Sequence, residues 1–192
     1  MCELENNVFG WLRRKKSDLP DPRQIEEPKD FGEFLLFAQY NIESYLQDFL
    51  KGTMNKHSSE INSTAVKIYS LAVVGCGCAR SATSEKQREF EKFRGLILGT
   101  VDAGPHASER DAVLEQNFQE CLAQYTDYAR RFPRDGDENI SQSLVDHFAR
   151  FVTGERVSPF DMLMASMEFC RVLDMTIAAE NMARDLPLKG QK

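Results

Sequence analysis

The sequence predicts an all-α protein, an antiparallel bundle of about six helices with a short N-terminal arm and a proline-rich linker. From Phe31 onward, apolar residues recur at steps of three and four, which is the period of a helix with one buried face. Residues that favour helix starts precede several of these segments, and few segments alternate as strands do. The chain of 192 residues is long enough for one domain with a sizeable core.

Four regions follow from this pattern. Residues 1–16 form a basic and aromatic arm, and residues 17–30, with three prolines and seven charges, form an irregular linker. Residues 31–186 form the helical bundle, and residues 187–192 form a tail.

Capping residues place the first three helices. Asp30 and Glu33 form a capping pair for the first, which stops near Gly52. The second runs over about Ser59 to Arg80 and is apolar on nearly all sides, which indicates the centre of a bundle. The third begins at a capping pair led by Ser84.

The last three helices are placed in the same way. A fourth helix starts after Ser108 and ends near Phe132, before a loop rich in acidic residues. A short fifth helix follows, with Ser141 as its cap. Ser158 caps the sixth, which has a proline in its first turn and continues to about Arg184.

The stretch VVGCGCAR, residues 73–80, allows two chemical interpretations. Metal and redox sites favour two residues between cysteines, but only one separates Cys76 from Cys78. On a helix these two side chains point about 200° apart. A dinucleotide-binding turn would place its third glycine at Arg80, and no alternation of strands and helices surrounds the stretch.

Close helix packing is the favoured interpretation of the same stretch. Small side chains there let a neighbouring helix approach, and they offset the helix propensity that glycine loses. We expect replacement of Gly75 by leucine to destabilise the fold. The small residues assigned to this face are Ala65, Ala72, Gly75, Cys76 and Ala79.

The N-terminal arm combines apolar residues, including the chain's one tryptophan, with four consecutive cations. Such a segment suits an anionic membrane surface or an anionic partner. In the alternative, Phe9 and Trp11 dock onto the bundle and the cations form a solvated edge. The residues of this candidate site are Val8, Phe9, Trp11, Leu12, Arg13, Arg14, Lys15 and Lys16.

An acidic segment between the fourth and fifth helices partly matches a calcium-binding loop. Asp135, Asp137, Asn139 and Asp146 stand at positions 1, 3, 5 and 12 of that pattern. Ile140 occupies the position that requires glycine, and position 12 is an aspartate instead of the longer glutamate. These four residues are weak metal candidates, and an acidic surface loop explains them equally well.

The three histidines give a second weak signal for a metal. His57 and His106 each precede a carboxylate by three residues, which is the reverse of the order in helical di-iron proteins. Both stand where helices are expected to start, so serine and glutamate there suit capping. His147 lies beside Asp146, and no nucleophile with a partnering base is visible.

The last helix is rich in methionine, and methionine-lined surfaces adapt to different partners. Met164 and Met167 are the candidates for an exposed partner groove. The other interpretation is that these methionines fill the core.

The composition of the chain disfavours some classes of function and location. A net charge of −6 argues against a general nucleic-acid binder. Five cysteines with irregular spacing are typical of reduced thiols in the cytoplasm. Neither an export signal nor a membrane span is recognisable in the sequence.

The sequence therefore favours a non-catalytic interaction or regulatory protein of the cytoplasm. It would bind a protein partner through its helices or its arm, with membrane-peripheral contact through the arm and no cofactor. The alternative is a metal-binding or metal-dependent enzyme that uses histidines and carboxylates within the bundle.

Overall fold

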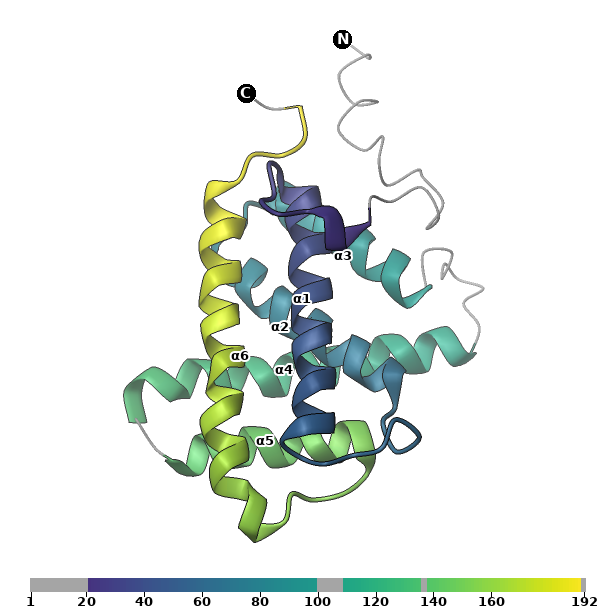
Figure 1. Ribbon diagram of the computed structural model, residues 1–192. Helices are drawn as coiled ribbons and strands as arrows, with labels where there is room; N and C mark the ends of the chain where they lie inside the picture. The colour runs from purple at the N-terminus through teal and green to yellow at the C-terminus, as the bar shows by residue number, and fades with distance from the viewer. Residues whose placement is uncertain (1–20, 100–108, 136–137, 191–192) are drawn as a thin grey trace.

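The computed structural model describes residues 21–99, 109–135 and 138–190, and every regular element in these ranges is helical (Figure 1). A short 3₁₀ turn, η2 (Pro22–Gln24), precedes the six α-helices. The helices are α1 (Phe31–Gly52), α2 (Ser63–Ser81), α3 (Ser84–Leu98), α4 (Glu109–Asp135), α5 (Glu138–Thr153) and α6 (Pro159–Asp185). The predicted all-α class and the six helices are confirmed.

Two of the predicted caps form the expected hydrogen bonds. The Asp30 carboxylate accepts from the backbone N–H of Glu33 at 2.9 Å, at the start of α1. The Ser158 hydroxyl accepts from the backbone N–H of Asp161 at 3.2 Å, at the start of α6. Both bonds satisfy N–H groups that have no partner inside the helix.

One other predicted start and one predicted cap were wrong. α2 begins at Ser63 and not near Ser59, because the Asn62 side chain accepts from two N–H groups of the first turn, each at 3.1 Å. α3 does begin at Ser84, but its cap is Thr83, whose hydroxyl accepts from the N–H of Lys86. Within a run of polar residues, the sequence pattern did not identify which one takes the cap geometry.

The boundary between the fourth and fifth helices also differs from the prediction. α4 continues past Phe132 to Asp135, and α5 begins at Glu138, so Ser141 lies inside the helix instead of capping it. Pro133 lacks a backbone N–H and so costs α4 one hydrogen bond, yet the helix continues for two residues beyond it. Pro133 therefore does not end α4.

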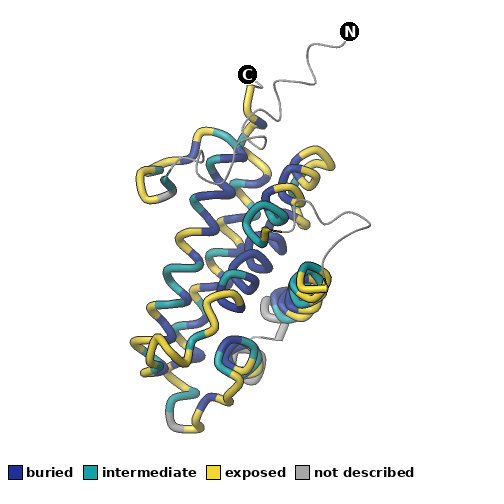
Figure 2. The backbone as a smooth tube through the Cα atoms, turned by 90° about the vertical axis from the view of Figure 1, so that its right-hand side faces the viewer, coloured by how far each residue is buried: buried dark blue, intermediate teal, exposed yellow. Residues whose placement is uncertain are grey.

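The helices form two crossing antiparallel pairs with α2 between them. α1 and α6 run side by side in opposite directions, and α4 and α5 run across them (Figure 1). In Figure 2, turned by 90°, α4 and α5 are seen nearly end-on. α2 packs against all five other helices, which confirms its predicted central place.

Glycines let α2 approach its neighbours, as the packing interpretation predicted, but the residues differ in part. A Cβ at Gly77 would lie 2.9 Å from the Ala179 Cβ and 3.0 Å from the backbone nitrogen of Glu180, both in α6. A Cβ at Gly75 would lie 2.9 Å from the ring of Phe90. Ala79, assigned to the packed face, is exposed.

The segments that flank the bundle contribute to its core. Pro28 of the linker and Leu188 of the tail are buried. The backbone N–H of Phe31 donates to the carbonyl of Pro187 at 2.9 Å. These contacts hold the start of α1 against the end of α6, at the top of Figure 1.

Candidate functional site

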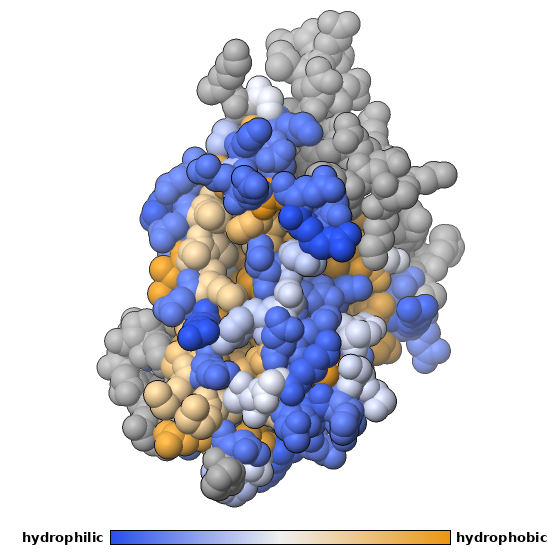
Figure 3. All heavy atoms as spheres, in the orientation of Figure 1, coloured by the Kyte–Doolittle hydropathy of each residue, from blue (hydrophilic) through white to orange (hydrophobic). Residues whose placement is uncertain are grey.

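An apolar groove lies between α1 and α6. Phe34, Ala38 and Ile42 are buried and form its floor on the α1 side. Figure 3 shows a strip of hydrophobic surface on this face, between stretches of hydrophilic surface. The residues that line the groove are Phe34, Phe37, Ala38, Asn41 and Ile42 of α1 and Met175, Ala178, Ala179 and Met182 of α6.

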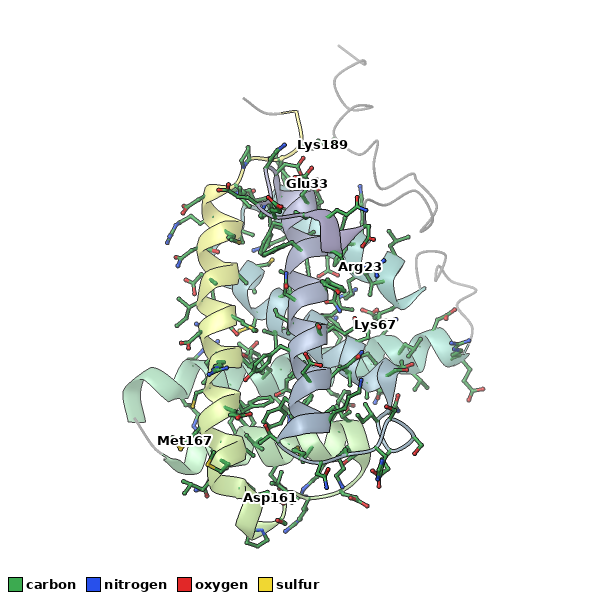
Figure 4. The ribbon with its side chains drawn as sticks, viewed as in Figure 1. Arg23, Glu33, Lys67, Asp161, Met167 and Lys189 are labelled. Atoms are coloured by element: carbon green, nitrogen blue, oxygen red, sulfur yellow. The ribbon has the colours of Figure 1, made fainter. Side chains whose placement is uncertain are left out.

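Methionines extend the nonpolar surface along α6 beyond the groove. Met164, Met175 and Met182 stand 11 and 7 residues apart, so they fall on one line of the helix to within about 20°. Met164 is 57% exposed and Met167, beside the line, is 65% exposed. Figure 4 shows Met167 pointing away from the body of the protein. Arg171, also exposed, interrupts the line.

The two walls of the groove are fixed to each other at its lower end. The Tyr45 hydroxyl donates to the backbone carbonyl of Glu168 at 2.6 Å, and the Thr53 hydroxyl donates to the carboxylate of the same residue. The rings of Phe49 and Phe169 meet edge to face at 5.3 Å. Because hydrogen bonds and packed aromatic rings join α1 to α6, the groove is a preformed feature.

Acidic residues predominate on the helices that form the walls. α1 and α6 together carry eight carboxylates and three cationic side chains. Arg80 of α2 offsets one of them, Glu180, at 3.7 Å. Asp48 and Asp174 are exposed. An apolar ligand with cationic flanks is therefore the electrostatic complement of this face.

A second hollow, also acidic, lies at the upper end of α1. Four carboxylates and one lysine line it, and Glu33 is the sequence neighbour of Phe34 in the groove. Figure 4 shows Glu33 at this upper end, near Lys189. The residues that line the hollow are Asp21, Gln24, Ile25, Glu26, Glu27, Lys29 and Glu33.

Met164 and Met167, the predicted groove candidates, are exposed, but neither lines the α1–α6 groove, and the prediction did not name as groove residues those that do. Phe37 and Ala178 are two of the residues that it missed. Phe37 is a large apolar residue outside the main apolar face of α1. Its position there could have indicated a second apolar surface on the outward side of the helix. Ala178 gives no signal, because alanine is frequent on any helix.

The cysteines of the central stretch are buried in an unbroken helix. Cys76 and Cys78 both lie within α2, and burial raises the pKa of each thiol, to about 12 for Cys78. Thiols with raised pKa values are poor nucleophiles at neutral pH. Their position supports the packing interpretation of VVGCGCAR.

The residues of the calcium pattern lie mainly in helices. Asp135 ends α4, and residues 138–146, Asn139 among them, belong to α5. Asp137 and the side chains of Asp135 and Asn139 lie outside the described part. The Asp146 carboxylate pairs with Arg150 at 2.7 Å. Because residues 138–146 are helical, they do not form the open loop that the pattern requires.

The two described histidines lie in separate parts of the fold. His57 lies exposed between α1 and α2, whereas His147, in α5, contacts the rings of Tyr69, Tyr128 and Phe151. Burial lowers the pKa of His147. In the described residues, no three His, Cys, Asp or Glu side chains are placed to share one metal ion.

The aromatic cluster around Tyr69 was not anticipated. Tyr69 is fully buried, and its ring lies 4.7 Å from that of Phe148 and 5.7 Å from that of Tyr125. The Tyr125 hydroxyl shares a hydrogen bond of 2.5 Å with the Thr176 hydroxyl. This cluster joins α2, α4, α5 and α6 as a structural core.

The basic arm, Val8 to Lys16, lies outside the described residues. Within those residues, no helix has the length and apolar character needed to cross a bilayer. Comparisons with protein-family models, curated proteins and solved structures gave no match for this chain.

Proposed function

We propose that this chain is a non-catalytic interaction or regulatory protein that binds a helix of a protein partner in the α1–α6 groove. The observation that carries the proposal is the apolar lining of Met175, Met182 and Phe37 between two helices that are fixed to each other. Methionine side chains adapt to the shape of an incoming helix. Grooves of this kind receive the apolar face of an amphipathic helix.

Carboxylates on α1 and α6, outside the apolar lining of the groove, would select the chemistry of that partner. Along α1 the groove lining runs from Phe34 to Ile42, so it is about 12 Å long, which matches about two turns of a helix. The line from Met164 to Met182 would extend the contact to about 27 Å. We expect a helix whose apolar side residues are flanked by lysine or arginine.

The test uses two fluorescein-labelled synthetic helices that share one leucine-lined face. One carries lysine on its polar face and the other carries glutamate. Fluorescence anisotropy with the full chain should show the lysine peptide binding at least about tenfold more tightly at low salt. The preference should shrink as salt is added, because surface charges are screened.

Ala178→Arg should abolish this binding, because it adds bulk and positive charge inside the groove. Ile177→Arg is the matched control: Ile177 is the neighbouring residue, is 54% exposed and does not line the groove. Failure of the lysine peptide to bind, or equal loss with both variants, would contradict the proposed function.

We also propose a cytoplasmic location. Cys76, Cys78 and Cys121 are buried thiols that form no disulfide, as reducing compartments favour. Fluorescence microscopy of the tagged chain in its host should show diffuse cytoplasmic signal, and enrichment in a secretory compartment would contradict the proposal.

A further inference from the structure

We infer that the chain's own N-terminal segment, Val8–Lys16, binds in the α1–α6 groove and competes there with the partner helix. The inference rests on the proposed function of the groove and adds its regulation. Three observations support it: matching chemistry, the order of residues along the chain, and the length of the connection.

The chemistry of the segment complements that of the site. Val8, Phe9, Trp11 and Leu12 are apolar, and four cations follow directly. The site offers an apolar groove next to an acidic hollow that contains Glu26, Glu27 and Glu33. Apolar side chains next to cations thus meet an apolar groove next to carboxylates.

The order of residues along the chain places the cations of the segment nearest to the acidic hollow. The described chain begins at Asp21, which itself lines the acidic hollow. Going back along the chain, the cations at 13–16 come first and reach the hollow, and the apolar residues come next. The groove begins at Phe34, one residue after Glu33 of the hollow. The cations and then the apolar residues of the segment therefore follow the same order as the acidic hollow and then the apolar groove.

The connection is long enough for this arrangement. Trp11 and Asp21 are ten positions apart, so the chain between them spans up to about 33 Å when extended. The groove lining extends only about 12 Å along α1, from Phe34 to Ile42. A connection this short also gives the segment an effective concentration on the order of millimolar at the groove. The chain's own segment therefore outcompetes that of a second copy at micromolar protein.

Trp11 is the chain's one tryptophan, so its fluorescence reports directly on the segment. In the full chain we expect its emission at shorter wavelength, with weaker acrylamide quenching, than in a free peptide of residues 1–20. Ala178→Arg should shift the emission to the wavelength of the free peptide and raise quenching to the peptide's level. Ile177→Arg should leave both unchanged, and circular dichroism should show the same helix content in all three proteins.

Several results would overturn the inference. The inference is wrong if Trp11 is as exposed in the full chain as in the free peptide. It is also wrong if the Ala178→Arg protein has the same emission as the unmodified chain. Emission that changes on dilution through the micromolar range would assign the groove to a second copy. A shift to shorter wavelength that appears only with phosphatidylserine vesicles would assign the segment to a membrane.

A second measurement separates this inference from the proposed function. Replacement of the four cations at 13–16 by glutamine should tighten binding of the lysine peptide, because the competitor is weakened. If the peptide binds both proteins equally and Trp11 is exposed, partner binding stands and the competition fails. If the peptide binds neither protein while Trp11 stays protected, docking of the segment stands and partner binding fails.

Discussion

Two glycines in α2 face different kinds of neighbour, and this difference decides what a methyl group would do at each. At Gly77 the new Cβ would meet backbone atoms of α6, the nitrogen of Glu180 at 3.0 Å and the carbonyl oxygen of Thr176 at 3.1 Å. At Gly75 it would meet the far edge of the Phe90 ring. A ring can rotate away, whereas the backbone of a packed helix cannot.

We therefore expect Gly77→Ala to destabilise the protein by about 1–3 kcal/mol through overpacking. Gly75→Ala should cost much less, because alanine gains about 1 kcal/mol of helix propensity over glycine and the ring of Phe90 can shift. Urea unfolding followed by circular dichroism measures both. A Gly77→Ala protein as stable as the unmodified chain would show that α6 can move away from α2.

The sequence pattern identified small residues in this helix but chose Gly75 over Gly77. Both lie in a helix that is apolar on nearly all sides, so periodicity alone did not orient it. Only the position of α6 shows that Gly77, unlike Gly75, lies against the backbone of a neighbouring helix.

At the scale of elements, Arg94 joins α3 to α4. Its guanidinium contacts Glu91 at 2.7 Å and Glu115 of α4 at 2.5 Å, and it lies 4.7 Å from the centre of the Phe118 ring. Arg94 is largely buried, with 13% of its side chain exposed. A planar guanidinium binds two carboxylates and an aromatic face at once, which the ammonium of lysine does not reproduce.

We expect Arg94→Lys to destabilise the protein, and a double-mutant cycle of Arg94→Met with Glu115→Gln to give a coupling energy of about 1 kcal/mol. Glu115 is one-third exposed, so solvent screening keeps the coupling small. Hydrogen exchange should show faster opening of α3 in Arg94→Met. Purely additive effects of the two substitutions would rule out the link between α3 and α4.

Helix limits were predictable where one capping residue stood alone. Asp30 and Ser158 were identified because a single good cap precedes an apolar run. The limits failed where several polar residues compete, as before α2, or where a proline-containing segment stays helical, as in α4. Backbone geometry at those ends depends on neighbouring helices as well as on local preference.

Over the whole molecule, burial of thiols and phenols makes stability depend on alkaline pH. Burial raises the pKa of Cys76, Cys78 and Cys121, and likewise those of Tyr69 and Tyr125. Below the ordinary thiol pKa of about 8.5, the thiols are protonated in both states, and this stability is fully present. As pH rises further, the unfolded chain loses protons that the folded chain keeps, so stability falls.

We expect the free energy of unfolding to fall steadily between about pH 8.5 and pH 10.5. Each buried thiol contributes up to about 1.4 kcal/mol per pH unit, and for Cys78 the loss continues to its folded-state pKa of about 12. Burial lowers the pKa of Lys86, so this one group makes stability rise with pH, opposite to the effect of the several thiols and phenols. Urea titrations under reducing conditions should show a shallower slope for Cys78→Ala, and an unchanged slope would contradict this account.

The sequence by itself determined the helical class, the six helices and the central place of α2. Apolar periodicity, and apolar residues on all sides of one helix, are local properties of the sequence. It also indicated that Met164 and Met167 are surface candidates. The tertiary structure decided which helices meet: α1 beside α6, with α4 and α5 across them. The groove exists only through that pairing, since Phe37 and Ala178 are more than a hundred residues apart and share no sequence pattern.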